Sequence, residues 1–326
     1  MSETPRPNKS TNGRTKSAAL RVTRAGFRVL SPHAPALAAR WAERLFLTAR
    51  RHERPSWEAE ALSSATVDRL PHEGKWLPTW TWTPAMTSDG PEATGATLEA
   101  PPTVVLVHGW EGRGSQLAAF VPALLDRGFR VVTFDAPGHG DSPLARASLV
   151  EHARALCSLG RALGPVHAVI GHSVGGAATL FATRYGFLAD RLALVAPPTT
   201  PASFAAVFAQ TLGLAPQIEA AMVARLEARY DIRFAELDVR ADAARLHQPM
   251  LVVHDHDDPI VPFASGKAIA DTAPRGRLLA VSALGHRAIL RAPSVIDAVT
   301  RFVDEEPTAS FARTLDGELF MRDMRW

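Results

Sequence analysis

The segment Gly171-His172-Ser173-Val174-Gly175-Gly176 decides the fold that this sequence predicts. It follows the apolar run Ala168–Ile170, which is typical of a buried strand, and it opens a helical pattern over Gly175–Arg184. A serine between two glycines at a strand-to-helix junction is typical of a sharp turn that exposes the hydroxyl for nucleophilic attack. The alternative is a glycine-rich turn without chemistry, and the strand-to-helix context favours the reactive serine.

Two later segments supply the groups that such a serine needs. A serine hydroxyl is a weak nucleophile until a base removes its proton. The apolar run Met250–Val253 leads into a loop that holds Asp258, the candidate acid, with Asp257 as the alternative. The last apolar run leads into His286, the candidate base. Each of these residues follows a predicted strand, so all of them are expected at one edge of a parallel sheet.

From residue 103 onward, short apolar strands alternate with helical patterns. The predicted strands are Thr103–Val107, Arg130–Phe134, Ala168–Ile170, Leu192–Val195, Met250–Val253 and Leu278–Val281. The predicted helices are Gln116–Asp126, Leu149–Leu163, Gly175–Arg184, Phe263–Asp271 and Ser294–Val303. This alternation predicts an α/β fold, with a mostly parallel central sheet covered by helices on both faces. The interval from Pro197 to Gln248 is too long for one crossover, and it predicts a small helical cap insertion at about 198–247.

The first hundred residues differ from the rest in charge and pattern. Residues 1–54 hold 12 Lys and Arg against 3 Asp and Glu, a net charge of +9, so the remaining residues carry −6 of the total of +3. We expect a disordered basic tail over 1–18. Over 19–102 we expect an N-terminal helix at Ala25–Arg51, either single or split in two near Pro35, followed by edge hairpin strands. The strands are expected at Thr66–Leu70 and Lys75–Thr83, with Pro78 at an edge or bulge. A catalytic core is expected over 103–326.

The apolar stripe of the N-terminal helix contains Leu37, Trp41 and Leu45. We expect this stripe to pack on the same protein, since its apolar area needs cover. Contact of the basic segment with a membrane surface is the alternative, and no nucleic-acid partner is expected.

Four motifs in order resemble those of the α/β-hydrolase superfamily, over residues from about 103 to 303. His108-Gly109-Trp110 resembles its oxyanion loop, and Asp135-Ala-Pro-Gly-His-Gly-Asp-Ser142 resembles the turn after its fourth strand. The serine turn and the ending "Asp-Pro-x-Val-Pro … Gly-His" complete the set. In this family the acid immediately precedes the Pro-x-Val-Pro run, which selects Asp258. Where the family usually has glycine after the strand's histidine, this chain has Asp255.

The resemblance implies a triad of Ser173, Asp258 and His286, with an oxyanion bound by the backbone N–H groups of Trp110 and Val174. It implies hydrolysis of a carboxylic ester or thioester, a small-molecule acyl substrate, through an acyl-enzyme. An acyltransferase or a perhydrolase would use the same triad, and a hydrolase-like binding protein without catalysis is a further alternative. A dehalogenase is disfavoured, because the dehalogenases of the family have aspartate at the position of Ser173.

The cap interval offers apolar side chains for a substrate pocket. The candidates are Phe204, Phe208, Leu212 and Met222, together with the indole of Trp110. The same stripe could instead pack the cap onto the sheet. The sequence leaves both interpretations open.

Metal binding is an alternative function for the loop after Val253. This loop offers ligand atoms that suit a metal ion within a few residues, from His254, Asp255, His256, Asp257 and Asp258. Ligands so close along one loop point in different directions, and the acid loop already explains Asp258. No metal and no cofactor are expected.

A single cysteine, Cys157, excludes an intrachain disulfide. The first residues lack the apolar core of a secretory signal, and no apolar run is long enough to suggest a membrane span. A cytoplasmic location is expected.

Overall fold

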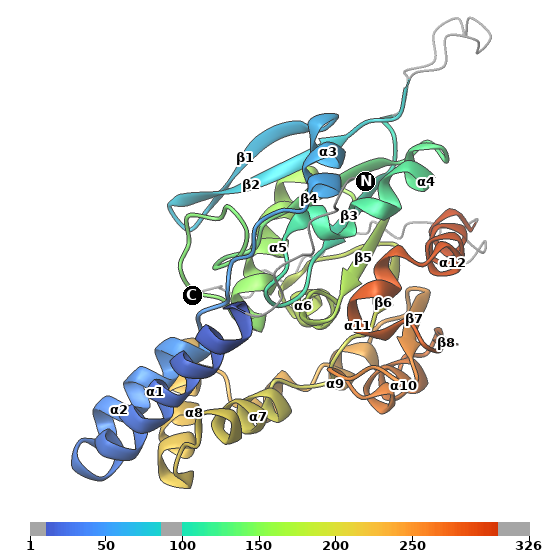
Figure 1. Cartoon of the computed structure of the whole chain (residues 1–326). Helices are drawn as coiled ribbons and strands as arrows, with labels where there is room; N and C mark the ends of the chain where they lie inside the picture. Colours follow the sequence, from blue (N-terminus) through green and yellow to red (C-terminus); the bar gives the residue numbers. More distant parts are fainter. Residues whose placement is uncertain (1–10, 86–99, 306–326) are drawn as a thin grey trace, which may run out of the picture.

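A computed structural model describes residues 11–85 and 100–305 of the chain. Its central sheet has eight strands in the order β1-β2-β4-β3-β5-β6-β7-β8 (Figure 1). The strands are β1 (Thr66–His72), β2 (Lys75–Trp82), β3 (Thr103–Val107), β4 (Arg130–Phe134), β5 (Ala168–His172), β6 (Arg191–Val195), β7 (Met250–Asp255) and β8 (Gly276–Val281). All neighbours from β4 to β8 pair in parallel, whereas β2 pairs antiparallel with both β1 and β4. The predicted fold class is confirmed.

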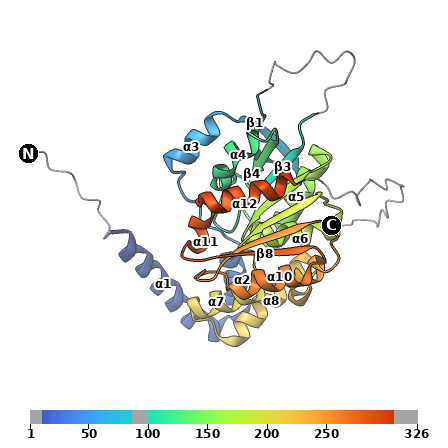
Figure 2. The same cartoon turned by 90° about the vertical axis from the view of Figure 1, so that its right-hand side faces the viewer.

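Helices cover both faces of the sheet (Figure 2). On one face lie α5 (Leu149–Leu163), α6 (Val174–Ala182) and α10 (Phe263–Thr272). The 3-10 helix η1 (Gly114–Phe120), α4 (Val121–Leu125) and α12 (Pro293–Asp304) cover the other. Side chains alternate between faces along a strand, so Val105 and Val107 of β3 enter one apolar cluster while Val104 and Leu106 enter the other. Burial on both faces explains the nearly continuous apolar runs.

The expected hairpin forms at the edge of the sheet, but Pro78 does not lie on the edge strand. β1 is the edge, and β2 lies between β1 and β4. The carbonyl oxygen of Pro78 accepts the Asp135 N–H at 3.1 Å, beyond the paired residues Thr79–Trp82. The backbone nitrogen and oxygen of a strand residue point to the same neighbouring strand, so the nitrogen of Pro78 also points towards β4. Because the β2–β4 pairing ends at Thr79, the absence of an N–H on Pro78 breaks none of the paired positions.

Several short helices were not predicted. They are α3 (Ser56–Ser63), α9 (Arg240–Ala243), α11 (Gly285–Ala288) and the 3-10 turns at Phe234–Leu237 and Ile289–Arg291. The predicted helix Gln116–Asp126 is divided between η1 and α4. Segments of one or two turns are too short to show an apolar period in the sequence.

At the N-terminus, α1 (Thr11–His33) and α2 (Pro35–Phe46) form a helical hairpin that is broken at Ala34. α1 therefore begins inside the segment 1–18 that is expected to be a tail. Residues 1–10 and 306–326 lie outside the described residues. No helix in the described ranges is long and apolar enough to cross a membrane.

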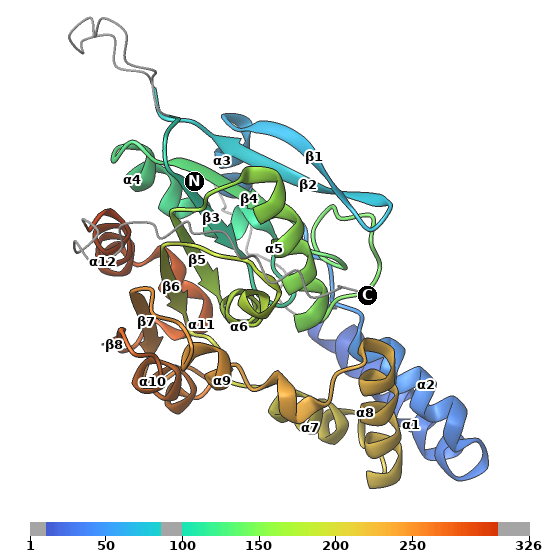
Figure 3. The same ribbon diagram turned by 180° about the vertical axis from the view of Figure 1, so that it is seen from behind.

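The interval between β6 and β7 contains α7 (Ala202–Leu212) and α8 (Pro216–Tyr230). The hairpin packs on these helices, α1 against α7 and α2 against α8 (Figures 1 and 3). We call α1, α2, α7 and α8 the composite cap. It is larger than the predicted insertion, because the sequence does not reveal that the two helical segments meet.

The contact face of α2 differs from the predicted stripe. Leu37 is 58% exposed, and the buried apolar residues of α2 are Ala38, Ala39 and Ala42. Alanine lets α2 approach α8 closely, and the larger residues lie beside this seam. Trp41 stacks on Phe27 of α1 with ring centroids 4.2 Å apart. The predicted packing on the same protein therefore occurs, with Trp41 and Leu45 of the stripe against the core, whereas Leu37 is exposed and alanines make the closest contact.

Candidate active site

Ser173 lies in the turn between β5 and α6, with backbone angles φ 53° and ψ −124°. A residue with a side chain rarely adopts this conformation, so the surrounding contacts must hold it. The Ser173 N–H donates to the Val195 carbonyl oxygen at 2.8 Å. A Cβ atom on Gly175 would lie 2.4 Å from the carbonyl oxygens of Val107 and His108, so only glycine fits there. Gly175 thus lets α6 begin directly against β3.

Hydrogen bonds join Ser173, His286 and Asp258. The His286 Nε2 atom lies 3.0 Å from the Ser173 Oγ atom, and the His286 Nδ1 atom lies 2.7 Å from the Asp258 Oδ2 atom. The other oxygen of Asp258 accepts the N–H groups of Ile260 and Val261 at 2.8 and 3.0 Å. Burial alone would raise the pKa of Asp258, but the hydrogen bonds from His286 and the backbone hold that pKa below its usual value. Asp257, the alternative acid, is exposed.

Asp255 holds the loop of His286 in place. Its carboxylate is fully buried and accepts the N–H groups of Leu284 and Gly285 at 2.6 and 2.7 Å and that of Asp257 at 2.7 Å. Burial raises the pKa of Asp255, and these three backbone donors outweigh it, so the pKa is lowered. The sequence interpretation gave Asp255 no role. The available signal was an acidic residue where the family usually has glycine.

His172 fixes the backbone of His286. The His172 Nε2–H donates to the His286 carbonyl oxygen at 2.9 Å. Burial lowers the pKa of His172 to about 3, with a further contribution from the neighbouring His286, so the ring is neutral near pH 7. His286 is therefore held through its backbone by His172 and through its ring by Asp258.

The loop after β3 passes beside Ser173. A Cβ atom on Gly109 would lie 2.9 Å from the Ser173 Cβ atom, so this close approach requires glycine. The Ala136 N–H donates to His108 Nε2 at 3.0 Å, which leaves Nδ1–H to donate to the Gly109 carbonyl oxygen at 2.8 Å. Burial lowers the pKa of His108 well below its usual value, in agreement with a neutral ring. Trp110, the next residue of this loop, lines the same cavity as Ser173 and Val174.

Val174 begins α6, so its N–H has no acceptor within the helix. The structure thus brings Trp110 and Val174, the two residues expected to bind an oxyanion, next to Ser173. Behind Trp110, the ring of His139 lies edge-on at 5.4 Å between centroids. Burial lowers the pKa of His139 to about 4, so this support for the indole is uncharged near pH 7.

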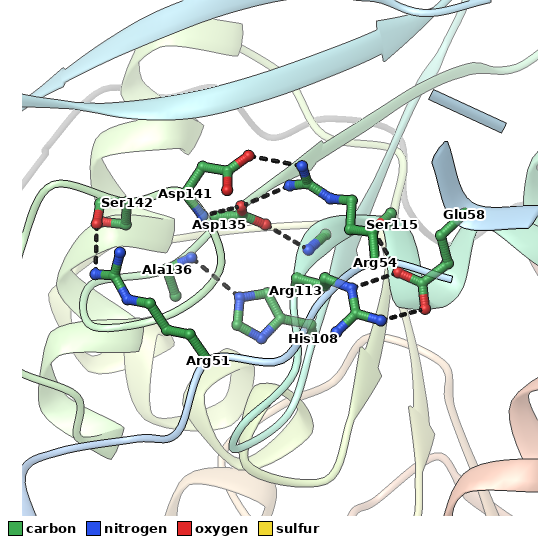
Figure 4. Close-up of polar contacts among 11 residues, drawn as sticks. Arg51, Arg54, Glu58, His108, Arg113, Ser115, Asp135, Ala136, Asp141 and Ser142 are labelled. Carbon is green, nitrogen blue, oxygen red and sulfur yellow. Dashed lines mark hydrogen bonds and ion pairs between the residues drawn. The ribbon is translucent and has the colours of Figure 1, made fainter. Parts of the chain in front are cut away.

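The loop after β3 is also fastened to the N-terminal segment (Figure 4). Arg113 donates to both carboxylate oxygens of Glu58, at 2.5 and 2.7 Å, and the Ser115 hydroxyl donates to Glu58 at 2.6 Å. The Glu58 side chain is 3% exposed and that of Arg113 is 10% exposed. α3 is therefore bound to the start of η1 by a buried, bidentate ion pair.

A second set of contacts in Figure 4 centres on Asp135, which follows β4. Its carboxylate accepts the N–H groups of Gly114 and Asp141, both at 2.7 Å, and the Arg54 guanidinium at 3.1 Å. Arg51 donates to the Ser142 carbonyl oxygen at 2.7 Å. Burial raises the pKa of Asp135 to about 6, although these donors oppose the rise. The N-terminal segment thus binds the loops that follow β3 and β4.

We expect Glu58→Ala to lower the free energy of unfolding by about 3–5 kcal/mol, because it leaves Arg113 buried without its partner. Urea denaturation monitored by circular dichroism measures this change. The matched control is Asp271→Ala, which removes an exposed ion pair with Lys267 (side chains 59% and 54% exposed) and should cost less than about 1 kcal/mol. Equal losses for the two variants would contradict the role assigned to the buried pair.

A cavity of about 1190 Å³ opens between the serine turn and the composite cap. Ser173 and His286 line it together with four predicted pocket residues, namely Trp110, Phe204, Phe208 and Leu212. The fifth, Met222, does not line the cavity. It is fully buried, because it lies on the same face of α8 as Ile218 and Leu226, four residues away on either side, and this face packs into the core.

The acid loop does not gather its histidines and carboxylates around one point. His254 Nε2–H donates to the Val261 carbonyl oxygen at 3.0 Å, and the His256 ring stacks on Phe263 at 3.9 Å. Within residues 11–85 and 100–305, one group has the spacing of metal ligands, His72, Glu73 and Glu151, whose ligand atoms lie within 4.8 Å of one another. Arg154 lies 3.7 Å from Glu73 and already supplies a positive charge there.

Known proteins resemble this chain in sequence and in fold. The chain is 48% identical over 84 residues to a pimeloyl-[acyl-carrier protein] methyl ester esterase of Methylococcus capsulatus, a match covering 26% of this chain and 32% of that protein. It is 32% identical over 237 residues to the enzyme of the same name from Chromobacterium violaceum, with 60% of this chain and 91% of that protein covered. The first match thus spans about a third of that relative's length.

Among solved structures, an esterase of Pyrococcus furiosus, Pf2001, aligns with a TM-score of 0.58 and 16% identity. The alignment covers 79% of this chain and 98% of that one, and it supports the fold. The family model described as "Alpha/beta hydrolase family" matches residues 104–299, more than half of the chain. The chain therefore belongs to the α/β hydrolase family.

Proposed function

We propose that this protein hydrolyses a carboxylic ester or thioester through an acyl-enzyme on Ser173. The observation that carries the proposal is the chain of hydrogen bonds from Ser173 Oγ through His286 to Asp258, at 3.0 and 2.7 Å, at the wall of a large cavity. The names of the two bacterial relatives support an ester as the substrate. Both are named for hydrolysis of a methyl ester.

In the first half of the reaction, Ser173 Oγ attacks the acyl carbon while His286 Nε2 takes the hydroxyl proton. The Asp258 carboxylate keeps Nε2 available as the acceptor and stabilises the imidazolium that forms. The N–H groups of Trp110 and Val174 bind the oxygen that becomes negative, and donors of this kind typically contribute about 3 kcal/mol each. His286 then protonates the leaving alcohol or thiol, and the acyl group stays on Ser173.

In the second half, His286 removes a proton from water, which attacks the acyl carbon. The tetrahedral species collapses, the carboxylic acid leaves, and the proton returns to Ser173. The same base serves both halves because its ring is held between Ser173 and Asp258 throughout.

Covalent labelling tests the proposal. A fluorophosphonate should modify Ser173 in the folded protein, and the protein should release nitrophenol from p-nitrophenyl acetate. Peptide mapping by mass spectrometry identifies the labelled residue, and urea-unfolded protein is the control that should stay unlabelled. Labelling at another serine, or hydrolysis that persists after complete modification of Ser173, would refute the mechanism.

A further inference from the structure

The hairpin of α1 and α2 lies outside the family region, residues 104–299, yet it forms part of the cavity wall. The hairpin lines the same cavity as Ser173 and His286, through Ala19, Leu20 and Thr23 of α1 and through Leu45 and Phe46 of α2. More than a hundred residues of chain separate these helices from the serine turn. Part of the cavity wall therefore comes from a segment that the family match does not include.

The hairpin is held firmly in this position. Glu43 of α2 is 3% exposed, and it accepts from Arg225 and Arg229 of α8 at 2.6 and 2.7 Å. Burial would raise the pKa of Glu43, but the two guanidinium groups outweigh it and lower that pKa, so Glu43 is ionised near pH 7. Arg24 of α1 donates to the Thr211 carbonyl oxygen of α7 at 2.8 Å. Polar contacts thus fasten each helix of the hairpin to a helix of the insertion.

The wall between these contacts is apolar. Phe46 of α2 meets Phe208 of α7 edge-to-face, with ring centroids 5.2 Å apart. Leu20, Leu45, Phe46 and Phe208 pack on the core but stay only partly buried, since one side of each faces the cavity. At about 1190 Å³, the cavity is somewhat larger than the roughly 300–1,000 Å³ usual for small-molecule sites. Apolar side chains on four helices around a space of this size suit a hydrocarbon chain that fills it.

We propose that the cavity is the site for the acyl chain of the substrate, with the α1–α2 hairpin as one of its walls. The substrate is then an ester or thioester of a medium- or long-chain fatty acyl group. This inference rests on the proposed function, because it places the acyl carbon at Ser173 and the hydrocarbon chain beneath the composite cap. Leu20 is the specificity-determining residue assigned to α1.

The test is the chain-length profile of kcat/KM with p-nitrophenyl esters from acetate to laurate. Burial of one methylene favours binding by up to about fourfold, so kcat/KM should rise at least about 10-fold from the butyrate to the octanoate ester. Leu20→Trp places a bulkier side chain in the cavity and should lower the octanoate-to-acetate ratio of kcat/KM at least about 10-fold. The matched control is Val22→Trp on the same helix, where Val22 is 72% exposed, and it should keep the wild-type ratio.

The outcomes separate this inference from the proposed function. Absence of hydrolysis of every ester, acetate included, overturns the proposed function itself. Hydrolysis of acetate with a flat or falling profile overturns the acyl-chain site alone. Equal ratios for Leu20→Trp and Val22→Trp overturn the role of the hairpin as a wall. Should Leu20→Trp fail to fold, judged by circular dichroism, Leu20→Phe makes the same comparison with a smaller insertion and should lower the ratio in the same direction.

Discussion

Replacement of Ser173 by alanine should lower kcat by on the order of 10³-fold or more. The Ser173 Oγ atom is the hydroxyl that lies 3.0 Å from His286 Nε2, and alanine leaves that base without a nucleophile to activate. Alanine keeps the Cβ atom, so the turn with φ 53° is retained and the melting temperature should change little. Stopped-flow or steady-state hydrolysis of p-nitrophenyl acetate measures the rate.

Ser203 provides a control variant, and Cys157 is another side chain to consider as a nucleophile. Ser203→Ala, at an exposed position on α7, should keep wild-type kcat, because Ser203 does not line the cavity. Cys157 cannot replace the lost nucleophile, since burial raises the pKa of its thiol to about 11. A Ser173→Ala enzyme with more than about a tenth of wild-type kcat would therefore show that the chemistry uses another group.

The sheet could be predicted from the sequence because its parallel strands are buried on both faces. Thr103–Val107 and Arg130–Phe134 appear as short apolar runs with the bounds that the structure gives β3 and β4. Where a strand ends in polar residues that the active site requires, the apolar pattern stops before the strand does. The prediction for β5 ended at Ile170, whereas the strand continues to His172, directly before Ser173.

The composite cap could be predicted only in part. Helical spacing in the interval 198–247 indicates helices, but it does not say which helix faces which. Met222 and Phe208 belong to the same apolar stripe in the sequence, and only packing against α2 and the sheet separates a core residue from a cavity residue. Leu37 illustrates the same limit, because Ala38 and Ala42 make the seam with α8 and leave the larger leucine 58% exposed.

The role of Asp255 depends on tertiary contacts that no local pattern reveals. Its three backbone donors come from two loops that are separated by about thirty residues of chain. The sequence shows only that an acidic residue follows His254. Three carboxylates in four positions look equivalent until the fold directs Asp255 to the backbone of the His286 loop, Asp258 to the His286 ring and Asp257 to solvent.

That division predicts the second large effect, a loss of about 10²–10⁴ in kcat for Asp258→Asn. The carboxylate accepts a hydrogen bond from His286 Nδ1–H at 2.7 Å, which leaves Nε2 free to accept the serine proton. An amide can instead present its NH₂ group to Nδ1, and the ring then carries its proton on Nε2, where it cannot act as the base. The negative charge that stabilises the imidazolium is lost as well. The measurement is kcat for p-nitrophenyl acetate across pH 6–9.

Two neighbouring variants distinguish this effect from a general disturbance of the loop. Asp257→Asn should keep kcat within about threefold of wild type, because its side chain is exposed and the structure pairs His286 with Asp258 instead. Asp255→Asn should act mainly through stability, since an amide oxygen can still accept from Leu284 or Gly285 while its NH₂ group faces the remaining N–H. The melting temperature of Asp255→Asn should therefore fall. Asp258→Asn should show a smaller fall in melting temperature and a far larger loss of kcat. Equal losses of kcat in Asp257→Asn and Asp258→Asn would contradict the assignment of the acid to Asp258.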